Sequence, residues 1–133
     1  MDFQFAEKDT LQSQGPVMQS DGATAAAGEP PIDRTHLFRM TLGDHALARE
    51  VLALFDRQIE TLIGRIGAAE PSTVPALAHT LKGSARGVGA FPMARAAEAL
   101  ETALPAARAP ALAALAAAAA EARAAIANIL GEA

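Results

Sequence analysis

The chain has 133 residues, 51% of them hydrophobic and 4% aromatic, and its formal net charge is −4 at pH 7. A chain of this length forms one domain. The absence of cysteine excludes disulfides, thiolate metal sites and cysteine nucleophiles, and the acidic balance argues against a nucleic-acid binder. The longest apolar run, residues 109–120, is too short to cross a membrane and contains a proline.

The N-terminus lacks the basic start and apolar block of a secretory signal, so we expect a cytoplasmic protein. Alanine is abundant and arginine outnumbers lysine, which points to a GC-rich bacterial genome. Residues 1–31 are rich in Gln, Ser, Gly, Ala and Pro without sustained periodicity, and they are predicted to form a flexible tail. The folded domain is predicted to span residues 32–133.

Two helices are predicted first along the domain. Asp33 can cap a short helix that ends near Met40, with Leu37 and Phe38 facing inward. Asp44 can cap a second, long helix that ends near Gly67. The apolar residues of this second helix recur at three- and four-residue spacing: Leu47, Val51, Leu54, Phe55, Leu62 and Ile66.

Proline and glycine residues mark the predicted helix boundaries in the rest of the chain. A third helix is predicted to begin at Ser72 or Thr73, with Pro75 in its first turn, and to stop at Gly89. A fourth helix is predicted to open at Pro92, and residues 105–110 are predicted to connect it to a last helix over residues 111–130. The inward residues are predicted to be Leu77, Leu81 and Val88, then Met93, Ala96, Ala97, Leu100 and Leu104, then Leu112, Leu115, Ala119, Ile126 and Ile129.

No segment has the alternation of a strand or the signature of a hairpin turn. Four main helices joined by short loops indicate an all-α fold. The expected architecture is an antiparallel up-down four-helix bundle with a short extra N-terminal helix.

The third predicted helix carries a histidine on its exposed side. At about 100° per residue, His79 lies roughly 160° from the centre of the apolar sector. Gly83 and Gly87 follow one and two turns further on, Lys82 and Arg86 flank them, and Ala76 and Ala90 extend the same face. Each glycine costs a helix about 1 kcal/mol relative to alanine, so we interpret the bare surface as clearance for a docking partner.

A phosphoryl-carrying histidine suits this surface. An exposed imidazole is partly neutral at cellular pH, and its free nitrogen can attack phosphorus. Lys82 and Arg86 could attract the phosphoryl oxygens. The chain has no phosphate-binding glycine loop and no kinase-like carboxylate cluster, so it is expected to pass on a phosphoryl group without binding ATP.

The stretch His79-Thr80-Leu81-Lys82-Gly83-Ser84-Ala85, followed by Gly89-Ala90, Met93-Ala94 and Leu100-Glu101, resembles the signature of histidine-containing phosphotransfer (HPt) domains. The resemblance covers about residues 32–130. It implies a four-helix bundle of bacterial multistep phosphorelays, with His79 as the phosphoryl acceptor and donor. It also implies that Lys82 aids the phosphoryl site and that Gly83 leaves room for the partner.

The resemblance implies partners as well. Family members exchange phosphate with an aspartate of a response-regulator receiver domain, which supplies Mg²⁺, and a hybrid histidine kinase feeds the relay. The chain is then a phosphocarrier and not an enzyme, it binds no cofactor or metal of its own, and an exposed single site suits a monomer. The surface predicted to meet the partner comprises Ala76, Gly83, Arg86, Gly87 and Ala90. No nucleic-acid or membrane partner is expected.

Two other functions share parts of this pattern. The chain could be the phosphorylatable domain of a chemotaxis-type histidine kinase, but the ATP-binding and dimerisation domains of such a kinase do not follow before Ala133. It could also be an HPt-like binding module that regulates a kinase without carrying phosphate, although such a module would be expected to lack His79. A metal site would require Glu-x-x-His pairs on the inner faces of the helices, and the sequence has none.

Overall fold

The computed structural model describes residues 28–132, and residues 1–27 of the predicted tail and Ala133 lie outside the described part. The described residues form helices and no strands, which confirms the all-α prediction. The elements are α1 (Arg34–Met40), α2 (His45–Ala68), the 3₁₀ turn η1 (Pro71–Thr73), α3 (Val74–Val88), α4 (Phe91–Glu101) and α5 (Pro105–Leu130).

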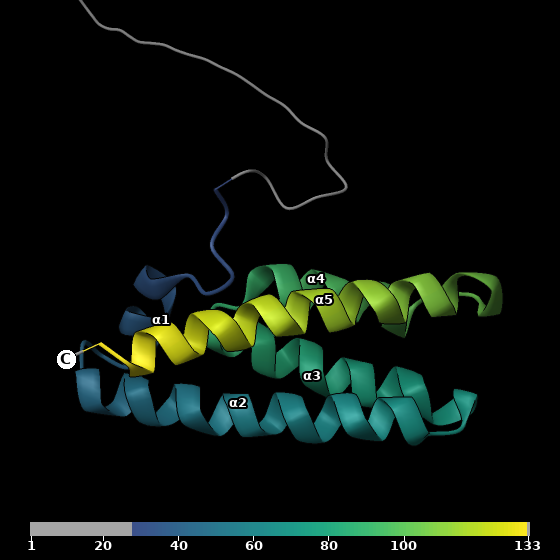
Figure 1. Cartoon of the computed structure of the whole chain (residues 1–133), viewed down its shortest axis with the longest axis horizontal. Helices are drawn as coiled ribbons and strands as arrows, with labels where there is room; N and C mark the ends of the chain where they lie inside the picture. Colours follow the sequence, from purple (N-terminus) through teal and green to yellow (C-terminus); the bar gives the residue numbers. More distant parts are fainter. Residues whose placement is uncertain (1–27, 133) are drawn as a thin grey trace, which may run out of the picture.

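The four longer helices lie side by side, with α2 and α4 running in one direction and α3 and α5 in the other (Figure 1). Helix α2 packs against α3 and α5, and α4 packs against the same two helices. The short helix α1 packs against α3 and α2. Because the loop between α3 and α4 contains only residues 89–90, these two helices form a hairpin whose ends lie close together.

The core between these helices is aliphatic, as the low aromatic content requires. Its largest fully buried side chains are Leu52, Ile59, Leu81, Met93, Leu100, Leu115 and Ile126. Alanines fill the remaining space where helices approach closely, with Ala78, Ala85 and Ala97 completely inaccessible. Burial of these apolar groups is the main stabilising term of such a bundle.

Local signals in the sequence set most of the helix ends. The carboxylates of Asp33 and Asp44 accept hydrogen bonds of 3.0 Å from the backbone N–H groups of His36 and Leu47, so both predicted caps are confirmed. Helix α3 ends at Gly89, whose φ of +89° places it in the left-handed region. Pro75 lies in the first turn of α3, as predicted.

The buried face of α2 is displaced from the predicted one. The side chains that enter the core are Ala48, Leu52, Phe55, Ile59, Leu62 and Ile66. Leu47 and Leu54 are exposed, because α2 has more leucines than one face can bury, and the four- and three-residue spacing from Ala48 excludes these two. Phe38 of α1, also predicted to face inward, is more than one-third exposed and lies against the His45 ring.

The predicted connection over residues 105–110 is wrong, since α5 begins at Pro105. Proline at the first helical position loses no hydrogen bond, because that N–H has no partner within the helix. Pro110 lies inside the helix and removes one bond, but the surrounding alanines have the highest helix propensity. Leu104, predicted to be buried on α4, precedes α5 and is exposed.

The full length of α5 also changes the expectation about membranes. Among the described helices, Pro105–Leu130 is long and apolar enough to cross a membrane by length and composition. The apolar run over residues 109–120 is shorter than a membrane span, but the helix that contains it extends from Pro105 to Leu130. A core helix of a soluble protein passes the same test, and Leu115, Ala119, Ala122 and Ile126 of α5 are buried in this core, so the finding is weak evidence for a membrane span.

Candidate functional site

His79 lies on the outer side of α3. The residues Leu77, Ala78 and Leu81 around it in the sequence are buried, which fixes the rotation of the helix. The His79 side chain is 67% exposed, so it faces solvent as the helical wheel predicts. Its ring is therefore open to another protein.

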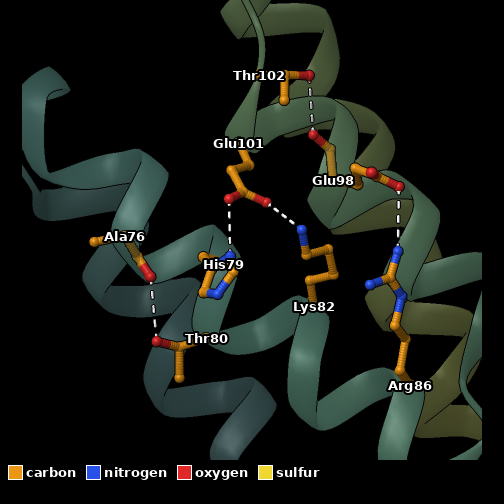
Figure 2. A network of polar contacts seen from close by, with 8 residues as sticks. All are labelled: Ala76, His79, Thr80, Lys82, Arg86, Glu98, Glu101 and Thr102. Atoms are coloured by element: carbon orange, nitrogen blue, oxygen red, sulfur yellow. Dashed lines mark hydrogen bonds and ion pairs between the residues drawn. The ribbon is translucent and has the colours of Figure 1, made fainter.

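A carboxylate from the neighbouring helix holds the imidazole. Oε2 of Glu101, at the C-terminal end of α4, lies 2.8 Å from Nδ1 of His79. Oε1 of the same carboxylate lies 2.7 Å from Nζ of Lys82. Figure 2 shows Glu101 between the two side chains, with the second ring nitrogen of His79 turned away from it.

The contacts of Glu101 affect its own ionisation and the tautomer of His79. They lower the pKa of the Glu101 carboxyl group, chiefly through Lys82 and then through His79. An ionised carboxylate accepts the proton of Nδ1–H, and this hydrogen bond favours the tautomer in which Nε2 carries the free lone pair. The nitrogen that faces solvent is thus the nucleophilic one.

Replacing Lys82 with methionine is expected to raise the pKa of Glu101, because the largest stabilising contact of the carboxylate is lost. His79→Gln should raise that pKa less, since the histidine is the smaller cause. A pH titration of the Glu101 carboxyl carbon by NMR measures both. Because the pKa is lowered in the folded protein, these contacts stabilise the fold above the ordinary carboxyl pKa and cease to do so as pH falls through the lowered value. A larger rise in the Glu101 pKa in His79→Gln than in Lys82→Met would contradict the order of these two causes.

The two glycines of the site are on the surface. Gly83 and Gly87 are exposed, and a Cβ added to either would meet no atom within 4 Å. Neither glycine is therefore required for packing within the described chain, and neither has a positive φ that would demand glycine. Their positions agree with a surface kept clear for an incoming partner.

The other predicted surface residues divide into two groups. Ala76 is exposed one turn before Thr80, and Arg86 is exposed and lies 3.4 Å from Glu98 of α4. Ala90, in contrast, is completely buried, so its side chain cannot line a docking surface. The prediction for Ala90 is wrong because it assumes that the helix continues to residue 90, whereas α3 ends at Val88 and Ala90 is buried after it.

Glu101 is the site residue to which the sequence reasoning gave no role. The sequence contains the signal, because α3 and α4 form a hairpin around residues 89–90. His79 lies ten residues before Gly89 and Glu101 lies eleven residues after Ala90, so the two face each other across the hairpin. Lys82 and Arg86 lie nearer to the turn than their partners Glu101 and Glu98, and their long side chains bridge the difference. Which side chains of α3 and α4 contact each other across the hairpin can be inferred only once the ends of both helices are known.

No group of three or more His, Asp or Glu side chains in the described residues could hold a metal ion. The groups that the structure brings together at this surface are an imidazole, a carboxylate and an ammonium group.

The model of one protein family, the Hpt domain, matches residues 43–132, a span that contains α2 to α5 and the whole network around His79. Comparison with curated proteins and with solved structures found no match. The family match covers most of the chain and agrees with its all-helical fold. The chain therefore belongs to the Hpt domain family, the phosphotransfer modules of phosphorelays.

Proposed function

We propose that this chain is a histidine phosphotransfer protein that accepts a phosphoryl group on Nε2 of His79 and exchanges it with the aspartate of a response-regulator receiver domain. The observation that carries the proposal is the contact between Nδ1 of His79 and Glu101 on an otherwise open surface. This contact orients the ring and leaves Nε2 free toward a partner. The family supports the same chemistry.

The group transfer requires no base on this chain. The lone pair of Nε2 forms a bond to phosphorus while the bond between phosphorus and the aspartyl oxygen breaks, and the aspartate leaves as a carboxylate. The proton on Nδ1 remains on the ring, which becomes cationic opposite Glu101. A carboxylate 2.8 Å away stabilises this developing charge.

The remaining parts of the system belong to the partners. A receiver domain would supply Mg²⁺ and the acidic groups around its aspartate, and a hybrid histidine kinase would feed the relay. The chain itself would act in the cytoplasm as a monomeric carrier built on the antiparallel four-helix bundle. Ala76, Gly83, Arg86 and Gly87, all exposed, would form the surface that meets the receiver.

The test is phosphoryl transfer to the full chain. The purified protein is incubated with a phosphorylated receiver and Mg²⁺, and an acid-labile, base-stable label is expected on the wild type and absent from His79→Gln. Equal labelling of His79→Gln would refute the assignment. ATP alone is expected to give no label, whereas labelling by ATP would show kinase activity. A folded wild type that binds a receiver but accepts no phosphate would instead indicate a regulatory binding module.

A further inference from the structure

The ammonium group of Lys82 is already paired with a carboxylate and is not free to bind phosphate. The Lys82 side chain is only 13% exposed, and Nζ lies 2.7 Å from Oε1 of Glu101. The Glu101 side chain is itself 23% exposed. A partly buried ion pair is screened less by solvent and salt than one on the open surface, so Glu101 is a strong partner for Lys82.

The phosphoryl group would be attached on the other side of the ring. Glu101 contacts His79 through Nδ1, and Nε2 lies on the opposite edge of the imidazole. Lys82, held against the same carboxylate, therefore lies toward the Nδ1 edge, as Figure 2 shows. To contact oxygens of a group on Nε2, the ammonium has to move away from Oε1.

Resting on the phosphotransfer function proposed above, we propose that Glu101 competes with the phosphoryl group for Lys82, so that Lys82 exchanges one anion for the other and the phosphoryl group on His79 is held only loosely. Glu101 then has two effects on the same site. It orients the nucleophile through Nδ1, and it withholds the nearest cation from the product. A loosely held phosphoryl group is suited to onward transfer more than to storage.

The competition can be measured without a receiver. Phosphoramidate is a small phosphoryl donor, and in its reaction with His79 the N–P bond to Nε2 forms while ammonia leaves with the electron pair of the broken P–N bond. Four full-length proteins are labelled in this way: wild type, Glu101→Gln, Lys82→Met and the double variant. After removal of the donor, the lifetime of the phosphohistidine is followed at neutral pH. Circular dichroism checks that each variant is helical.

The decisive quantity is the factor by which Glu101→Gln changes the lifetime of the phosphohistidine. This factor is measured once with Lys82 present and once in the Lys82→Met protein. If Glu101 withholds Lys82, the substitution lengthens the lifetime in the presence of Lys82 by a factor several times larger than in Lys82→Met. If Glu101 and Lys82 act on the phosphoryl group independently of each other, the two factors are equal. Equal factors, or a smaller factor with Lys82 present, would overturn the proposal.

The outcome is separate from that of the receiver experiment. Chemical labelling of His79 with a clear difference between the two factors would stand even if no receiver transferred phosphate to the chain. Failure of phosphoramidate to label folded wild type at His79 would overturn the competition directly, because it would show that Nε2 is not available. Labelling of His79→Gln to the wild-type level would do the same.

Discussion

Replacing Gly83 with glutamate is expected to leave the helices folded and to slow phosphoryl transfer from a phosphorylated receiver by about tenfold or more, which corresponds to a rise of at least about 1.4 kcal/mol in the activation free energy of transfer. Gly83 is exposed one turn after His79, and its missing Cβ faces open space. In the proposed docking, a glutamate there would occupy the volume through which the receiver approaches Nε2. Within the chain it would displace nothing.

The measurement compares the initial rate of transfer from the receiver with the rate of labelling by phosphoramidate. A donor as small as phosphoramidate does not need the cleared surface, so Gly83→Glu should retain chemical labelling while losing transfer from the receiver. Ala116→Glu is the matched control, since Ala116 is exposed on α5, which packs against α2 and α4. This control is expected to behave as wild type in both assays.

Two results would count against the clearance argument. Wild-type transfer by a folded Gly83→Glu protein would show that the receiver does not approach across Gly83. Loss of both reactions would show that the substitution disturbs the imidazole itself. Unfolding of the variant, detected by circular dichroism, would contradict the open space around the Cβ position.

Features fixed by neighbouring residues were predictable from the sequence. The caps at Asp33 and Asp44 depend on a carboxylate and an N–H group three residues apart, and the end of α3 depends on one glycine. The outward direction of His79 follows from the period of a single helix. These relations are local, so no knowledge of the packing is needed to find them.

Features that depend on the neighbouring helices were harder to predict. The sequence alone did not reveal that Leu47 and Leu54 would remain exposed, because apolar character does not say which of several possible faces another helix will cover. The start of α5 was missed because prolines usually mark loops, whereas Pro105 opens the helix and Pro110 is tolerated within it. Glu101 acquires its role only from the α3–α4 hairpin.

Gly89 ends α3, the helix that carries His79, and contacts the start of α1. Replacing this glycine is expected to have a large effect on the stability of the fold. Its carbonyl accepts a hydrogen bond of 2.8 Å from the N–H of Asp33, the residue that caps α1. A Cβ at Gly89 would lie 2.9 Å from the Asp33 carbonyl oxygen and 3.3 Å from Cδ2 of His36. The contact with the backbone oxygen cannot be relieved by a side-chain rotation, so α1 would have to shift relative to α3.

Gly89→Ala is therefore expected to lower the free energy of unfolding by about 2–4 kcal/mol. The left-handed backbone alone costs an alanine roughly 1–2 kcal/mol, and the displacement of α1 adds to this. For a domain of this size the midpoint of thermal unfolding should fall by about 10 °C or more. Thermal and denaturant unfolding followed by far-UV circular dichroism measure the loss.

Gly87→Ala, in the same helix, distinguishes the cause. Gly87 has no positive φ and no atom within 4 Å of an added Cβ, so alanine should stabilise α3 by about 1 kcal/mol through helix propensity alone. Opposite signs for the two substitutions would show that Gly89 is required by its backbone conformation and its contact with Asp33, while Gly87 is not required for folding. Equal free energies of unfolding for Gly87→Ala and Gly89→Ala would contradict that distinction. The opposite signs would also leave docking as the reason for a glycine at position 87, since the fold would be better served there by alanine.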